Sequence, residues 1–217
     1  LVNQVTQSGQ VEAGGFVPSG VYDADGADGD DFRTVGGDYY KPTDADYEAN
    51  CDEARQLLAD AGYPNGEGFP VVEYLYNTSD AHKAVAEALQ FMWEEELGVK
   101  VTLNNQEWAA FLQTRKDGDY SIARNGWIAD YNDPISFLDM WMTGGGNNDA
   151  QYANDDYDAL IKQAKTTTDN AERMDLLHQA EDKLIGEDNV LAPLYFYTQK
   201  YMLADGIEGM YYCPLGY

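Results

Sequence analysis

The stretch of residues 71–103 constrains the fold more than any other part of the chain. Residues 71–76 are rich in valine and tyrosine, as in a β-strand, and Ser79 then begins a helix with an apolar residue at every third or fourth position. Gly98 ends this helix, and residues 99–103 again have the composition of a strand. A strand, a helix and a second strand in this order predict a β-α-β unit with parallel strands.

The alternation of strand and helix continues beyond this unit. A short helix over residues 107–115, a Lys-Asp-Gly turn and a strand beginning at Tyr120 follow. Strands that alternate with helices predict an α/β fold with a mixed sheet flanked by helices. The remaining expected elements are helices over residues 1–7, 135–142, 157–164 and 170–184, a helix from Asp44 or Asp46 to Ala61, an edge strand over residues 190–197, a loop over residues 8–40 and a mobile loop over residues 144–148.

The balance of charge limits the possible partners. With 39 acidic and 13 basic residues, the 217-residue chain has a formal net charge of -26 at pH 7. A polyanion would be repelled, so nucleic acid is not expected as a partner. No run approaches the roughly 20 apolar residues that a membrane-spanning helix needs. Cys51 and Cys213 fit no CxxC motif, and the sequence leaves open whether they form a disulfide.

Residues 123–134 read Ala-Arg-Asn-Gly-Trp-Ile-Ala-Asp-Tyr-Asn-Asp-Pro and lie where a strand is expected to leave the sheet. Ligand sites in α/β proteins favour that place. The carboxylate of Asp130, the guanidinium of Arg124 and the indole of Trp127 can together hold a small zwitterion. The alternative is a strand end with a core tryptophan and a turn formed by Asn-Asp-Pro.

Motifs for catalysis or metal binding find little support. The histidines His82 and His178 lack a cysteine or second histidine at the spacing of a zinc site, and no phosphate-binding glycine loop or nucleophile motif occurs. Residues 23–31 are rich in aspartate and resemble a calcium loop, but Ala27 stands where an EF-hand has an oxygen ligand. We expect an acidic surface loop there, no metal site and no cofactor; a calcium-stabilised module is the alternative.

Six phrases follow one another along the chain. They are Ala-Gly-Tyr-Pro-Asn-Gly at residues 61–66, Tyr-Asn-Thr-Ser-Asp-Ala-His-Lys at 76–83, Leu-Gly-Val-Lys-Val at 97–101, Asn-Gln-Glu-Trp at 105–108, Arg-Asn-Gly-Trp-Ile-Ala-Asp-Tyr-Asn-Asp-Pro at 124–134 and Val-Leu-Ala-Pro-Leu-Tyr at 190–195. In this order and spacing the chain resembles, from end to end, the oligopeptide-binding proteins of ABC importers, which belong to solute-binding protein family 5.

The resemblance implies a two-lobed periplasmic-binding-protein-like fold of class II, in which residues 1–217 form the carboxyl-terminal lobe, or domain III. The amino-terminal lobe and a secretory or lipoprotein signal are expected upstream of this chain. If residues 1–217 are a lobe inserted between two hinge crossings, Leu1 and Tyr217 should lie near each other on one face. Because the ligand groove needs both lobes, residues 1–217 alone should bind peptide poorly.

The resemblance also assigns a role to individual residues. Asp130 matches the aspartate that holds the α-ammonium of the peptide, and Trp127 and Trp108 match tryptophans that line side-chain pockets. The alternative for Trp108 is a place in the core.

Polar and basic positions match as well. Arg124, Arg115 and His82 match positions that meet peptide carboxylates or acidic side chains, and Asn105 matches a polar contact. The alternatives are a cation on a helix surface for Arg115 and a solvated helix cap for His82.

Taken together, the resemblance implies a non-catalytic, extracytoplasmic protein, periplasmic or a cell-surface lipoprotein, that binds short peptides and delivers them to the membrane permease of an ABC importer. Sequence-tolerant binding is expected, because extended peptides are held largely by their backbone. A nickel-chelate or haem carrier is the alternative within the family, and a secreted hydrolase fragment is the alternative outside it.

Overall fold

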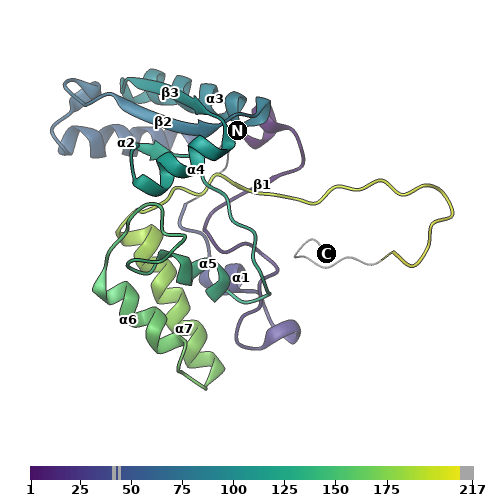
Figure 1. Cartoon of the computed structure of the whole chain (residues 1–217). Coiled ribbons are helices and arrows are strands. Elements are labelled where there is room, and N and C mark those ends of the chain that lie inside the picture. Colours follow the sequence, from purple (N-terminus) through teal and green to yellow (C-terminus); the bar gives the residue numbers. More distant parts are fainter. Residues whose placement is uncertain (41–42, 44, 211–217) are drawn as a thin grey trace. The chain divides into compact units, whose positions relative to one another are not determined.

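The computed structural model, drawn in Figure 1, describes residues 1–40, 43 and 45–210. The chain divides into two compact units. The first unit combines Leu1–Ser8 with Lys41–Gly126, and the second unit combines Gly9–Tyr40 with Trp127–Tyr217. Each unit is therefore assembled from two separate parts of the sequence.

A three-stranded parallel sheet forms the centre of the first unit. In this sheet β2 (Val72–Asn77) lies between β3 (Val101–Gln106) and β4 (Ile122–Ala123). The β-α-β unit predicted from the sequence is confirmed, and so is the α/β class. A mixed sheet was expected, but all strands of this sheet are parallel, and the antiparallel pair of strands forms a separate sheet in the second unit.

Helices flank this sheet. The connection between β2 and β3 is α3 (Asp80–Leu97), and the connection between β3 and β4 is α4 (Trp108–Asp117). Both helices end at a left-handed glycine, Gly98 and Gly118. The first unit also contains α2 (Tyr47–Asp60), a π-helical turn over Val2–Thr6 and a 3-10 turn over Pro64–Gly66. Ser79 and Asp46 stand at the N-caps of α3 and α2 as expected, but neither side chain makes the capping hydrogen bond.

The core of the first unit lies between the central strand and α3. Tyr74, Leu75 and Tyr76 of β2 are all buried, as is typical of a central strand covered on both faces. They are joined in the core by side chains from the helices, from β3 and from the turn between α3 and β3, which are Val85, Ala86, Leu89, Val99, Val101 and Phe111.

Gly98 is needed where the end of α3 meets the loop after α2. Its φ is +67°, and a Cβ added to it would lie 2.3 Å from the backbone oxygen of Asn65. The backbone at Asn65 and Gly66 thus lies directly against Gly98.

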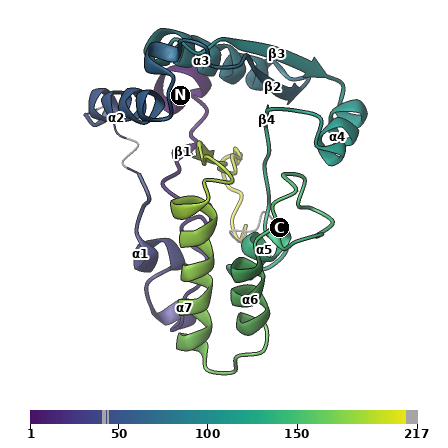
Figure 2. The same cartoon turned by 90° about the vertical axis from the view of Figure 1, so that its left-hand side faces the viewer.

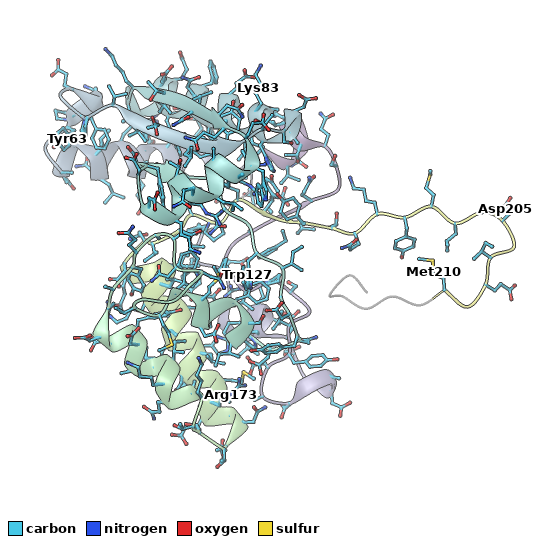
Figure 3. All side chains as sticks on the ribbon, in the orientation of Figure 1. Tyr63, Lys83, Trp127, Arg173, Asp205 and Met210 are labelled. Carbon is cyan, nitrogen blue, oxygen red and sulfur yellow. The ribbon has the colours of Figure 1, made fainter. Side chains whose placement is uncertain are left out.

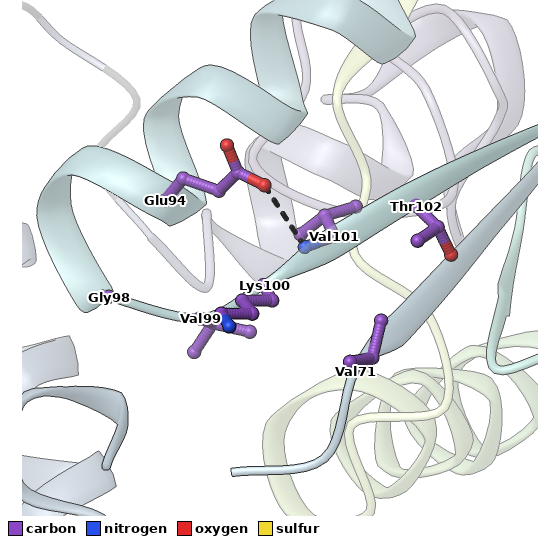
Figure 4. Close-up of a pocket in the computed structure, with 7 residues that line it drawn as sticks. All are labelled: Val71, Glu94, Gly98, Val99, Lys100, Val101 and Thr102. Carbon is purple, nitrogen blue, oxygen red and sulfur yellow. Dashed lines mark hydrogen bonds between the residues drawn. The ribbon is translucent and has the colours of Figure 1, made fainter. Parts of the chain in front are cut away.

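A pocket of about 470 Å³ lies at the amino ends of β2 and β3 (Figure 4). There the α3 side chains of Gln90 and Glu94 bind the backbone of Val101: Gln90 donates to its carbonyl at 2.7 Å and Glu94 accepts from its amide at 3.2 Å. Helix side chains thus occupy the open edge of β3, which otherwise exposes hydrogen-bonding groups. The ligand-binding residues expected in this unit lie at the opposite, carboxyl end of the strands.

Helices are the main regular elements of the second unit. Figure 2 shows α6 (Asp155–Ala164) and α7 (Asn170–Glu181) side by side. Both begin at a side-chain cap, because Asn154 accepts from the amides of Asp156 and Tyr157, and Asp169 accepts from that of Glu172. The other elements are α1 (Phe32–Gly36), α5 (Ile135–Leu138), 3-10 turns over Gly26–Asp28 and Asp139–Trp141, a π-helical turn over Asp182–Glu187, and the antiparallel strands β1 (Val11–Glu12) and β5 (Tyr195–Phe196).

The core of the second unit gathers apolar residues from all its helices. Phe32 from α1, Leu138 from α5, Tyr157 and Ile161 from α6 and Leu177 from α7 are inaccessible to solvent. The Tyr157 hydroxyl donates to the Leu138 carbonyl, so this buried polar group is satisfied.

Three expectations for the second unit were wrong. Residues 8–40 are not all loop, because they contain α1. The apolar run at 190–197 is a strand only at Tyr195–Phe196; Val190 and Leu191 pack on the core instead. The loop at 144–148 is fastened by Asn148, which is buried and whose Nδ2 lies within hydrogen-bond distance of the carbonyls of Trp141, Met142 and Tyr152.

The aspartate-rich loop has structural contacts at both ends. Asp23 is buried and its Oδ2 lies 2.8 Å from Nε2 of His178, which stacks on Phe32. Asp31 caps α1 by accepting from the Thr34 amide, and it also accepts from the Gly20 amide. These carboxylates are therefore used to hold the loop against the unit.

Two expectations fall on residues outside the described part of the chain. One is the proximity of Leu1 to Tyr217, and the other is the open question whether Cys51, which is half-buried, is bonded to Cys213 or both are idle thiols. Among the described residues, no helix is long and apolar enough to cross a membrane.

Candidate functional site

The parallel sheet gathers expected ligand-binding residues at one edge of the first unit. Because β2, β3 and β4 all run in one direction, their carboxyl ends meet at the same edge. Asn105 lies near the end of β3, Arg124 follows β4 directly, and His82 is in the first turn of α3. Trp108 begins α4 and Arg115 lies in its last turn.

Arg124 is positioned through both its backbone and its side chain. Its amide donates to the Leu75 carbonyl at 2.8 Å, which extends the pairing of β4 with β2. Its Nη1 lies 3.4 Å from Oδ1 of Asn77, a buried residue at the end of β2. The guanidinium is thus kept near the centre of the sheet edge, where it can attract an anion.

His82 is half-buried beside this guanidinium. Burial lowers the pKa of His82, and the positive charge of Arg124 lowers it further. The backbone of Asn77 has a smaller, opposite effect and raises it. Its Nδ1 is buried without a hydrogen-bond partner among the described residues. The expected alternative, a solvated cap, does not describe this environment; a neutral imidazole here adds hydrogen-bonding capacity without a second positive charge.

Arg115 and Trp108 share the buried ring of Phe111. The Arg115 guanidinium lies 5.2 Å from the centre of this ring, and the Trp108 ring is stacked on it with centres 5.8 Å apart. Nη1 of Arg115 donates to Oδ1 of Asn125 at 2.9 Å, and the same oxygen accepts from the Gly126 amide. Trp108 is 53% exposed, so it is not a core tryptophan; it offers a flat apolar surface on a fixed base.

Asn105 belongs to a polar cluster between the ends of β2 and β3. The Thr78 hydroxyl lies 3.0 Å from Oδ1 of Asn105 and 3.1 Å from Oε1 of Glu107. One hydroxyl proton satisfies only one of these acceptors, so the exposed cluster retains capacity to accept hydrogen bonds.

The second unit presents the other two expected residues, Trp127 and Asp130. Trp127 is labelled in Figure 3. Its ring packs against the core of this unit, and its Nε1 donates to the Ser136 carbonyl at 2.6 Å. Asp130 is exposed, and its amide donates to Oγ of Ser136 at 3.0 Å. Trp127 therefore combines the two alternatives, a core tryptophan and a ligand-binding indole. Its N–H is already bonded inside the unit, and only its ring is available to a ligand.

The loop that follows Asp130 is fastened on two further sides. Asn132 accepts from the Tyr22 amide and donates to the Gly20 carbonyl. Asp133 forms a 2.7 Å ion pair with Arg173 of α7, a residue labelled in Figure 3.

The surface around Asp130 is apolar and negative in potential. Ile128 is 71% exposed and Tyr131 is 50% exposed. Burial raises the pKa of Tyr131, and the carboxylates near it, including that of Asp130, raise it further. An ammonium group would find charge attraction and apolar neighbours at this place.

Several residues that hold the site were not predicted from the sequence. Asn77, Asn125 and Ser136 each bind an expected ligand-binding residue. For Ser136 a signal existed, because it is a lone polar residue in the apolar run Ile-Ser-Phe-Leu. Among the described residues, no group of three or more His, Cys, Asp or Glu side chains is arranged to hold a metal ion.

Residues 1–149 match the family model of bacterial extracellular solute-binding proteins, family 5 Middle. The chain belongs to this family, whose members bind solutes and are not enzymes. The resemblance noted in the sequence is confirmed.

Individual relatives agree with this assignment. The chain is 38% identical over 218 residues to the dipeptide-binding protein DppE of Bacillus subtilis, covering 100% of this chain and 38% of DppE. It is 35% identical over 209 residues to the periplasmic oligopeptide-binding protein OppA of Salmonella typhimurium, covering 96% of this chain and 36% of OppA. The chain thus spans well under half the length of these relatives.

A solved structure reproduces the fold. The Haemophilus influenzae OppA complex with the peptide RPPGFSPFR superimposes with a TM-score of 0.73 at 31% identity, over 90% of this chain and 36% of that one.

Proposed function

We propose that this chain forms the ligand-gripping, carboxyl-terminal lobe of a peptide-binding protein that serves an ABC importer. The ligands are short peptides and the partner is the membrane permease of the importer. Family membership and relatives named for dipeptide and oligopeptide binding support this proposal. The protein works outside the cytoplasm, in the periplasm or as a cell-surface lipoprotein, in line with relatives named as periplasmic.

The observation that carries the proposal is the presentation of Asp130. Its carboxylate is exposed while its backbone is bound to the buried Ser136, so a charged group is held ready at the surface of a fixed loop. Asp130 binds the α-ammonium of the peptide. Exclusion of water when a peptide is enclosed strengthens this ion pair.

The remaining residues meet other parts of the peptide. Arg124, Arg115 and His82 bind carboxylates, from the peptide's carboxyl terminus or from acidic side chains. Trp108 and Trp127 offer flat surfaces to side chains without demanding hydrogen bonds, and Asn105 adds a polar contact. Such contacts fit a ligand class of variable sequence.

Isothermal titration calorimetry on the full natural protein in which this chain occurs tests the proposal. The probes are a short mixed-sequence peptide and its N-acetylated twin, with Asp130→Ala as the variant. Losing a charged hydrogen bond should weaken binding of the free-amine peptide by roughly 10- to 100-fold, both on acetylation and in the variant. The control Asp175→Ala removes an exposed carboxylate of α7 and should bind normally.

Equal binding of the two peptides would show that Asp130 is not the ammonium anchor. If neither peptide binds, the peptide class itself is wrong, and nickel chelates and haem become the next ligands to titrate.

A further inference from the structure

Ser136 contacts both ends of the segment that carries the proposed ammonium site. It lies in α5, where only 4% of its surface is exposed. Its hydroxyl oxygen accepts from the Asp130 amide at 3.0 Å, and its carbonyl accepts from Nε1 of Trp127 at 2.6 Å. One buried residue therefore fixes the backbone of Asp130 and the side chain of Trp127, three positions earlier.

The exposed Asp130 side chain cannot be positioned by packing of its own. Ala129, directly before it, is buried, and the Asp130 amide is bonded, so the backbone on the amino side of the carboxylate is fixed. The position of the carboxylate then depends on the backbone, since short side chains such as aspartate have few rotamers.

Ser136 is itself held in place. Its amide donates to the Asp133 carbonyl at 3.1 Å, and Oδ1 of Asp133 both accepts from the Ile135 amide and pairs with Arg173. A chain of contacts thus links α7 to Ser136 and from there to Asp130.

We propose that Ser136 is a positioning residue that sets the affinity for the free α-ammonium of a peptide by holding the backbone of Asp130. This inference rests on the proposed role of Asp130. Ser136 does not touch the ligand. Its hydroxyl serves Asp130 and its carbonyl serves Trp127, so a side-chain substitution separates the two contacts.

The test compares binding of the free-amine peptide and its N-acetylated twin by titration calorimetry on the full natural protein. The variants are Ser136→Ala, which removes the hydroxyl, and Ser136→Cys, which keeps a similar shape with a weaker acceptor. We expect the ratio of the two affinities to fall at least fivefold in both variants. The acetylated peptide should bind within about twofold of normal, because the carbonyl that holds Trp127 remains.

A matched control separates positioning from general loss of stability. Ile135→Val removes one methylene from the buried neighbour of Ser136 and leaves the Asp130 amide bonded. It should destabilise the second unit and leave the affinity ratio unchanged. A combined Ser136→Ala/Asp130→Ala variant should have the ratio of Asp130→Ala alone, because the serine acts through the aspartate.

The outcomes are distinguishable. If Asp130→Ala abolishes the preference for the free amine and the Ser136 variants keep it, the positioning role is wrong and the proposed function stands. If Asp130→Ala leaves the preference intact, both fail. Hydrogen exchange gives an independent readout: the Asp130 amide should be protected at least tenfold in the unsubstituted protein, and exchange at the unprotected rate would overturn the inference.

Discussion

The buried ion pair between Arg33 and Glu181 allows a quantitative prediction for the second unit. Glu181, in α7, is 0% exposed and Arg33, in α1, is 6% exposed. Oε1 of Glu181 lies 2.9 Å from Nη1 of Arg33 and 2.9 Å from the amides of Phe16 and Val17. One carboxylate oxygen therefore joins α7, α1 and the segment before α1.

Glu181→Gln keeps an oxygen acceptor for the two amides but removes the charge opposite a buried guanidinium. Breaking one partner of a buried pair costs about 3–5 kcal/mol of unfolding free energy. Asp38 lies 3.7 Å from Nε of Arg33 and is 55% exposed, so it compensates only in part. We expect a loss near the lower limit, about 3 kcal/mol.

Urea unfolding followed by circular dichroism measures this loss, and hydrogen exchange of the α7 amides assigns it to the second unit. The control is Glu187→Gln, which breaks the pair of an exposed carboxylate with Lys183 and should cost much less than Glu181→Gln. Arg33→Met/Glu181→Gln removes the unpaired guanidinium as well and keeps the oxygen that accepts from the two amides, so it should recover at least half of the loss. A cost for Glu181→Gln no larger than that of the control would refute the reasoning.

Three further predictions concern Gly98, His82 and the net charge. Gly98→Ala should lower the free energy of unfolding by more than about 2 kcal/mol, because φ is positive and the new Cβ would meet the Asn65 oxygen. Gly62→Ala should lower it by only about 1 kcal/mol, because φ is +95° but nothing lies within 4 Å of the new Cβ. Equal shifts in melting temperature for the two variants would contradict this. Because the pKa of His82 is lowered in the folded protein, the unfolded chain binds the proton more tightly, and the free energy of unfolding should decrease as the pH is lowered below about 6.5. In His82→Gln this decrease should be smaller, and parallel pH profiles of the two proteins would argue against the prediction. Because the net charge is -26, salt should screen repulsion between carboxylates, and the melting temperature should rise by roughly 5 °C between 0.02 M and 1 M NaCl. A melting temperature that does not change with salt would show that this repulsion contributes little to the stability.

The regular part of the fold was predictable because hydrophobic periodicity is strong there. Apolar spacing located α3, and glycine marked its end. Prediction failed where tertiary contacts decide the structure. The five residues of α1 are too few to carry a periodic pattern, and Val190 and Leu191 are apolar because they pack on a helical core. Asn148 looked like a loop residue although its amide fastens the loop from inside.

For the site, the sequence indicated the side chains that can face a ligand but gave little sign of those that hold them. Charged and aromatic residues near strand ends are visible in a sequence, and the parallel strands of the first unit bring His82, Trp108 and Arg124 to one edge of the sheet. Asn77 and Asn125 were overlooked because an asparagine at a strand end is equally typical of an ordinary turn.

The difference between these two groups of residues has a physical cause. A side chain that binds a polar ligand must stay accessible, and so it cannot be fixed by burial. Two of the proposed ligand-binding residues are held by polar side chains: the backbone amide of Asp130 donates to the hydroxyl of Ser136, and the guanidinium of Arg115 donates to Oδ1 of Asn125. The free energy for positioning then comes from hydrogen bonds that exist before the ligand arrives, which lowers the entropy lost on binding. Under the proposed function, side-chain pockets that accept many peptides need little shaping, and rigidity is best placed under the groups proposed to meet the ammonium and carboxylate that every peptide carries.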